Sequence, residues 1–182
     1  MDEKMIKHPK VSLLKWMNPA GMLEHELEKV PWYIAIIISG IAFGLLFWQT
    51  GLDQRAVKEI GIPEIATLAI KGILMGTLGV IVLSFFVWVF IRITNKSISL
   101  EQAIKQMALS YTAPMVGLLF GLILNIAFGS RTAIAFGISG VLWSLNPIFR
   151  TIKKASKDRI FLSLFLTTAI GLIVMLSWDF LV

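Results

Sequence analysis

A polar stretch beside a proline offers the side chains best suited to chemistry in this sequence. It consists of three consecutive residues, a nearby proline and a more distant amide: Ser110, Tyr111, Thr112, Pro114 and Asn125. Hydroxyl and amide groups in an apolar helix either bond to neighbouring helices or line a polar cavity. The proline removes one backbone hydrogen bond and leaves a carbonyl one turn earlier without its donor, so we expect a kink. Two alternatives therefore stay open here, namely interhelical packing and a polar cavity at the kink.

A second group of candidate residues is basic. Five cations and one acid, Asp158, lie between positions 150 and 159, and the cations are Arg150, Lys153, Lys154, Lys157 and Arg159. Such a cluster can bind anionic lipid headgroups or an acidic partner. Basic residues also gather on the cytoplasmic side of membrane proteins, where they set the orientation. Both interpretations apply to this segment, which we expect to be a loop.

The sequence favours no catalytic or cofactor chemistry. It contains no cysteine, and His8 and His25 both precede the first apolar run. Glu24 and Glu28 flank His25, but two carboxylates one helical turn apart are more typical of a solvated face than of a metal site. The centres of the apolar runs carry none of the ionisable residues that proton relays and ion pathways need. We therefore expect no enzyme activity, no catalytic residue, no metal site and no cofactor.

The elements that must position these residues are membrane-spanning helices. Hydrophobic residues make up 57% of the chain and charged residues only 15%. A helix needs about 20 apolar residues to cross the hydrocarbon core. Five runs meet or nearly meet this length, at about 32–50, 67–92, 106–128, 132–149 and 160–181. Because their polarity does not alternate as in barrel strands, we expect an all-α fold, a polytopic bundle of five transmembrane helices at 32–182.

Several local signals refine this architecture. The tripeptide Gly129-Ser130-Arg131 predicts a tight antiparallel hairpin between the third and fourth runs. Ser99 and Gln102 have the spacing of a capping box, which predicts a helix that continues into the third run. Glycines four residues apart let helix backbones approach closely, and we expect packing inside the bundle rather than dimerisation. Three such pairs occur: Gly40 with Gly44, Gly72 with Gly76, and Gly117 with Gly121.

The segment 1–31 precedes the first run and is polar. Asn18 and Pro19 suit the N-cap and first position of a helix. Leu23 and Leu27 would then share one face, opposite acidic residues. We expect a short amphipathic helix, which either lies in the membrane interface or packs under the bundle.

The charge distribution predicts an orientation. The net charge is +6, and thirteen of the Lys and Arg residues fall on one side of the predicted topology, while four fall on the other. The more basic side is expected to be cytoplasmic, which places the amino terminus inside and Val182 outside. A nucleic-acid partner is not expected, because the cations lie at the ends of apolar runs rather than on one folded face.

The run Ser110-Tyr111-Thr112-Ala113-Pro114 resembles the tyrosine-then-proline motif in the third span of the Yip family, five-span membrane proteins named for interacting with Rab-type GTPases. Asn18-Pro19 is similar to a feature of the bacterial branch, and the short amino-terminal segment resembles that compact branch. Together with the missing intramembrane charges and catalytic motifs, the resemblance leads us to expect a non-enzymatic integral protein that organises partners or lipids in a plasma membrane of bacterial type. The expected partners are the lipid bilayer and either a membrane protein or a second copy of the chain.

The polar third run also suggests a second function, a small transporter or channel for a neutral or lipidic substrate. The two hypotheses differ in one structural observation. A transporter requires that Tyr111 and Asn125 face a cavity, whereas an organising protein allows them to pack against neighbouring helices.

Overall fold

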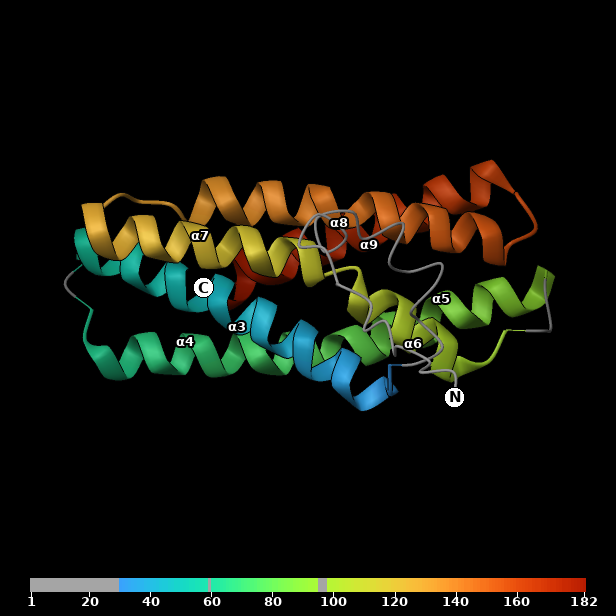
Figure 1. Ribbon diagram of the computed structural model, residues 1–182, viewed down its shortest axis with the longest axis horizontal. Coiled ribbons are helices and arrows are strands. Elements are labelled where there is room, and N and C mark those ends of the chain that lie inside the picture. Colours follow the sequence, from blue (N-terminus) through green and yellow to red (C-terminus); the bar gives the residue numbers. More distant parts are fainter. Residues whose placement is uncertain (1–29, 59, 95–97) are drawn as a thin grey trace, which may run out of the picture.

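The computed structural model describes residues 30–58, 60–94 and 98–182, and all regular structure in these ranges is helical (Figure 1). Five helical segments are long and apolar enough to cross a membrane, and they start at Trp32, Ile62, Leu100, Ala133 and Ile160. The predicted all-α bundle with five spanning helices is confirmed. The amphipathic helix expected after Asn18 lies outside the described residues.

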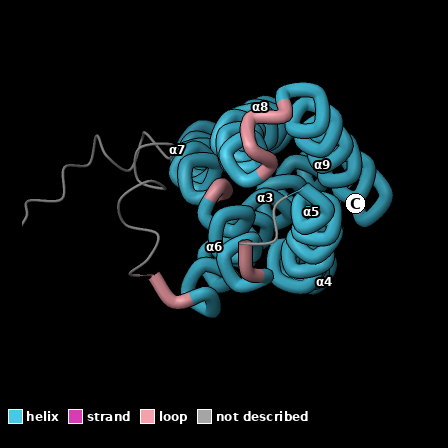
Figure 2. The backbone as a smooth tube through the Cα atoms, turned by 90° about the vertical axis from the view of Figure 1, so that its right-hand side faces the viewer, coloured by secondary structure: helices cyan, strands magenta, loops and turns pink. Residues whose placement is uncertain are grey.

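Helix α3 (Trp32–Lys58) is the centre of the bundle. In an apolar 18-residue stretch of α3, 67% of the residues are buried, whereas 22% are buried in the corresponding stretch of the second spanning segment. Figure 2, which looks along the bundle, shows the other helices arranged around it. The sequence explains this position, since small residues such as Ala35, Gly40 and Ala42 let neighbours approach α3 from several sides.

The second segment pairs with α3 along its glycines. It consists of α4 (Ile62–Leu74), a π-helical turn η1 (Met75–Gly79) and α5 (Val80–Thr94). A Cβ atom at Gly72 would meet the carbonyl oxygen of Phe43, and one at Gly76 would meet that of Ser39. The predicted close packing at these glycines is confirmed. At Gly117, by contrast, none of the described residues lies within 4 Å of an added Cβ, so this glycine makes no close contact with that part of the chain.

The π turn was not predicted from the sequence. A π turn adds one residue to the helical repeat and changes which side chains face the neighbouring helix. The Ser39 hydroxyl of α3 donates to the carbonyl oxygen of Gly76 inside this turn. The hydroxyl thereby bonds to a carbonyl at one of the points where α3 and the second segment approach closely.

The third segment is divided in two by its proline. Helix α6 (Leu100–Leu109) begins with the predicted capping box, in which Ser99 and Gln102 bond to each other's backbone N–H groups. Helix α7 (Thr112–Phe128) follows after a break at Ser110 and Tyr111. Pro114 therefore lies in the first turn of α7, where a missing N–H costs little. We expected a kinked continuous helix, and the structure has an interruption, because the proline cannot donate to the Ser110 carbonyl.

The fourth and fifth segments are α8 (Ala133–Ala155) and α9 (Ile160–Leu181). The predicted tight turn before α8 is confirmed, with Gly129 at φ 64° closing α7 in the left-handed conformation. The turn after α8 is a Schellman motif, in which the Asp158 N–H donates to the Lys153 carbonyl oxygen at 2.9 Å. Lys157 and Asp158 both have positive φ there.

Most helices are longer than the apolar runs that predicted them. Helix α3 continues past residue 50 to Lys58, and the second segment begins at Ile62 rather than at residue 67. Helix α8 continues past residue 149 to Ala155, so the expected basic loop at 150–159 is mostly helix. Hydropathy measures the part of a helix that suits hydrocarbon, but backbone hydrogen bonds continue into the polar flanks.

The bundle has two ends. We call the end where α3 and α7 finish and α4 and α8 begin the Asp53 end. The other, where α5 and α8 finish and α6 and α9 begin, is the basic end. At the Asp53 end α3 and α7 extend further than α8 and α9, as the left side of Figure 1 shows.

Candidate functional site

The polar residues before Pro114 are largely satisfied within their own segment. The Ser110 hydroxyl donates to the Gln106 carbonyl oxygen at 2.8 Å, and the Thr112 hydroxyl donates to the Leu109 carbonyl oxygen at 2.8 Å. Both side chains are buried. Hydroxyls that bond back to a carbonyl one turn earlier present little polarity to a ligand.

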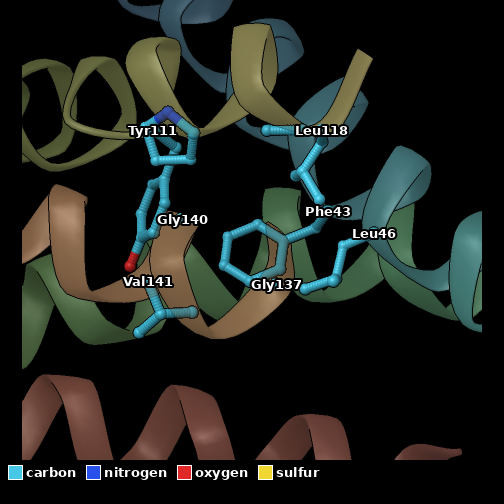
Figure 3. Close-up of a pocket in the computed structure, with 9 residues that line it drawn as sticks. Phe43, Leu46, Tyr111, Leu118, Gly137, Gly140 and Val141 are labelled. Carbon is cyan, nitrogen blue, oxygen red and sulfur yellow. The ribbon is translucent and has the colours of Figure 1, made fainter. Parts of the chain in front are cut away.

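Tyr111 is buried between three helices. Its ring packs edge-on against Phe43 of α3, with the ring centroids 4.8 Å apart. Figure 3 shows the side chain reaching toward Gly140 and Val141 of α8. The cavity beside it has a volume of about 10 Å³ and apolar walls. A space of this size holds about one water molecule, so it is too small for a solute.

Asn125 lies at the Asp53 end and is separate from the residues near Pro114. Its amide nitrogen donates to a carboxylate oxygen of Asp53 and, at 2.9 Å, to the Ser130 carbonyl oxygen. The structure thus brings Ser110, Tyr111 and Thr112 together around the helix break, and it places Asn125 in a different cluster.

The basic candidate residues lie on the last turns of α8 and the turn that follows. Arg150 and Lys154 are exposed on the helix, and Lys157 and Arg159 are exposed beyond it. Lys153 forms a partly exposed ion pair with Asp158 at 3.9 Å. An exposed pair at this distance adds little stability, so the cluster remains available to solvent or headgroups.

Asp53, which sequence reasoning missed, connects three helices at the Asp53 end. One carboxylate oxygen accepts from Asn125 of α7, and the other accepts from the backbone N–H of Ala133 at 2.7 Å. Ala133 is the first residue of α8, and that helix has no side-chain cap of its own. A carboxylate at a helix amino terminus satisfies an unpaired N–H and interacts favourably with the helix dipole. Asp53 therefore caps α8 from α3.

Thr132 occupies the N-cap position of α8, but its side chain does not cap the helix and forms hydrogen bonds to buried groups instead. Its hydroxyl donates to the Gly121 carbonyl oxygen at 3.0 Å and accepts from the side-chain amide of Gln49 at 3.1 Å. Gln49 is fully buried, and its side-chain oxygen has no hydrogen-bond partner among the described residues. An unpartnered buried acceptor costs stability. This makes Gln49 the least satisfied polar group of the cluster.

Helix α9 is attached to the same end by two hydrogen bonds. The Trp178 indole N–H donates to the Thr50 hydroxyl at 3.1 Å, and the Lys71 ammonium donates to the Leu181 carbonyl oxygen at 2.8 Å. Gly137 of α8 leaves room for the Trp178 ring, because a Cβ there would lie 2.8 Å from the indole. A cation at the last carbonyls of a helix also complements its dipole.

These contacts frame a groove of about 560 Å³ between α3, α8 and α9 at the Asp53 end. Trp178 and Thr50 form part of its lining, and apolar side chains of α8 and α9 form another part. Charged side chains line it near the end of α3 and the start of α8. The lining residues are Thr50, Asp53, Gln54, Val57, Lys58, Arg131, Ala133, Ile134, Ile138, Met175, Trp178, Asp179 and Val182.

Three charged side chains of the groove have no ionic partner in the described part of the chain. Lys58, Arg131 and Asp179 are exposed, and none of them forms an ion pair with a described residue. Asp53 differs, because both of its oxygens already accept hydrogen bonds. The groove thus combines an apolar wall with two cations and one carboxylate that can reach a ligand.

The sequence alone did not indicate this site. Its lining residues lie on or beside α3, α8 and α9, and α3 is far from the other two helices in the chain. In the sequence, Arg131 and Asp179 were recognisable only as residues that flank apolar runs. The one available signal was Asp53 itself, an acid that lies on the helical continuation of the first run. Comparisons of the chain with protein-family models, with curated proteins and with solved structures found no match.

Proposed function

We propose that this protein is a non-enzymatic integral membrane protein that holds a membrane lipid in the groove between α3, α8 and α9. The groove carries this proposal, because it is large, lined by apolar side chains on α8 and α9, and polar at one end. Such a combination is typical of sites for amphipathic ligands. The Yip-type role of organising lipids or partners agrees with it.

The depth of the groove supports a lipid occupant. Helix α3 has 27 residues and is about 40 Å long, whereas the hydrocarbon core is about 30 Å thick. Lys58, its last residue, therefore falls in the headgroup region. Thr50 is eight residues earlier, or about 12 Å deeper, and falls near the boundary between the headgroups and the acyl chains. A lipid could place its headgroup beside Lys58 and a chain along Ile138 and Met175.

Solute transport has less support. Two cavities inside the bundle, one at Tyr111 and one beside Ser110, have volumes of about 10 Å³ each. Neither offers the space that a conducting path through the third segment would need. The residues that suggested transport from the sequence are engaged in packing and in hydrogen bonds to backbone carbonyls, and Asn125 also donates to the Asp53 carboxylate.

For the cellular setting we propose a bacterial plasma membrane with the amino terminus in the cytoplasm. The distribution of basic residues supports this orientation. It places the groove at the outer face of the membrane and the candidate residues Arg150, Lys154, Lys157 and Arg159 at the inner face.

The test is lipid retention by the purified protein. Ile138→Trp should fill the groove, so native mass spectrometry after delipidation in detergent should detect less bound lipid than for the wild type. Ile126→Trp is the matched control, because Ile126 is exposed at the same end of the bundle but does not line the groove. Equal retention by the wild type and both variants, or no retained lipid at all, would contradict lipid holding in this groove.

A further inference from the structure

The charges that line the groove differ in sign and in location. Lys58 lies at the end of α3 and Arg131 just before α8, whereas Asp179 lies in the last turn of α9. All three line the same groove, and none has an ionic partner among the described residues. A ligand that complements them carries negative charge toward α3 and α8 and positive charge toward α9.

The helix termini beside these charges also affect which ligand charge each wall of the groove favours. Arg131 precedes the amino terminus of α8, whose partial positive charge favours anions. Asp53 offsets part of that field, but its two oxygens are occupied by Asn125 and by the Ala133 N–H.

Asp179 lies at the carboxyl end of α9, where the helix dipole is negative and favours cations. The Lys71 ammonium offsets part of that field, because it donates to the Leu181 carbonyl oxygen. At α8 and α9 the side chain and the helix dipole therefore favour the same ligand charge, whereas at the carboxyl end of α3 the Lys58 side chain alone favours an anion.

We infer that the groove selects a phospholipid whose headgroup carries both a phosphate and a primary ammonium, the phosphoethanolamine group. This inference rests on the proposed lipid site. The phosphate interacts with Arg131 and Lys58, and guanidinium groups suit phosphate oxygens well. The ammonium donates hydrogen bonds to the Asp179 carboxylate. The acyl chain lies along the wall that includes Ile138, Met175 and Trp178.

Other common headgroups fit less well. A phosphocholine group has the same charges, but its quaternary ammonium cannot donate a hydrogen bond to Asp179. A phosphoglycerol group carries no cation, so it leaves the Asp179 carboxylate without a partner close to its own negative charge. The expected order of affinity is therefore phosphatidylethanolamine, then phosphatidylcholine, with phosphatidylglycerol the weakest.

The experiment is a titration of the delipidated, full-length protein in detergent with these three lipids, each carrying two oleoyl chains, followed by native mass spectrometry. We expect phosphatidylethanolamine to bind at least about threefold more tightly than phosphatidylcholine, a modest factor because the charges are partly exposed. Asp179→Asn should abolish that preference with little loss of phosphatidylcholine binding. Arg131→Gln should weaken the binding of all three lipids.

Two charge variants at the same end serve as controls. Arg55→Gln and Glu64→Gln each remove an exposed charge that does not line the groove, so both should keep the wild-type order. These controls show whether a change in lipid preference comes from contacts in the groove or from a general change in the surface potential of the protein.

The outcomes distinguish the inference from the proposed function. Binding that is lost in Ile138→Trp but shows no preference for phosphatidylethanolamine would overturn the headgroup inference and leave the lipid site in place. A preference that survives Asp179→Asn, or one for phosphatidylglycerol, would overturn it as well. Failure of all three lipids to bind would remove the lipid site itself and the inference with it.

Discussion

At the scale of single residues, Asp53 and Gln49 show that two polar groups in one helix can have opposite energetic consequences. Asp53 has a partner for each oxygen, since Asn125 and the Ala133 N–H both donate to it. Gln49 has partners for its nitrogen, but its buried oxygen has none among the described residues. Both carboxylate oxygens of Asp53 therefore accept a hydrogen bond. The buried side-chain oxygen of Gln49 accepts none from the described residues, which costs stability.

Asp53→Asn should therefore destabilise the protein. The new amide would place an N–H₂ group against either the Asn125 nitrogen or the Ala133 N–H, so one of the two hydrogen bonds is lost and a donor faces a donor. We expect a loss of about 1–3 kcal/mol in the free energy of unfolding. Equilibrium unfolding in mixed detergent micelles measures it, and an unchanged midpoint would show that Asp53 does not cap α8.

Gln49→Met should change the stability much less. Methionine has a similar length and removes the unpartnered oxygen, while the Thr132 hydroxyl keeps its bond to the Gly121 carbonyl oxygen. We expect a change of less than about 1 kcal/mol, in either direction. The same unfolding assay checks this, and a loss as large as that of Asp53→Asn would contradict our description of Gln49 as poorly satisfied.

At the scale of elements, the sequence predicted what depends on local chemistry. The capping box at Ser99 and the left-handed turn at Gly129 follow from a few adjacent residues, and both are confirmed. Pro114 predicted a disturbance of the third segment, but we expected a kink, and the structure has a break at Tyr111. The π turn at Gly76 could not be predicted, because it depends on how α3 packs against the second segment and on a hydroxyl from Ser39.

Gly76→Ala tests that packing. Its Cβ would meet the Ser39 carbonyl oxygen, and it would lie 2.9 Å from the Gly40 Cα, so α3 and the second segment must move apart. We expect a loss of about 1–3 kcal/mol in the free energy of unfolding. Gly117→Ala is the matched control and should be neutral or stabilising by up to about 1 kcal/mol, because no described residue lies within 4 Å of its added Cβ and alanine favours helix. Equal effects of the two substitutions would contradict the close approach at Gly76.

At the scale of the whole molecule, hydropathy predicted the number of spanning helices but not the groove. The runs ended at residue 50 and at residue 149 because polar side chains follow, yet the helices continue to Lys58 and Ala155. The groove lies beside the continuation of α3, where this helix extends beyond α9. Helix α3 is distant in sequence from α8 and α9, so only the tertiary arrangement brings Lys58, Arg131 and Asp179 to one cleft.

The orientation of the molecule can be tested with single cysteines, because the chain has none. Arg55→Cys and Lys154→Cys place exposed thiols at the Asp53 end and the basic end, respectively. In a bacterial plasma membrane, a membrane-impermeant maleimide applied to intact spheroplasts should label the first variant and should label the second only after lysis. The reverse pattern would place the groove on the cytoplasmic side.

The most direct test of the account asks whether an acyl chain lies against Trp178. In a variant with Phe at the other five tryptophan positions, phosphatidylethanolamine with brominated acyl chains is titrated into the protein in detergent micelles. We predict that the fluorescence of Trp178 is quenched in a saturable manner at about one lipid per protein. A variant that keeps only Trp143, which is exposed away from the groove, should show a gradual, non-saturating decrease. The same gradual decrease for Trp178 would contradict a lipid held in the groove.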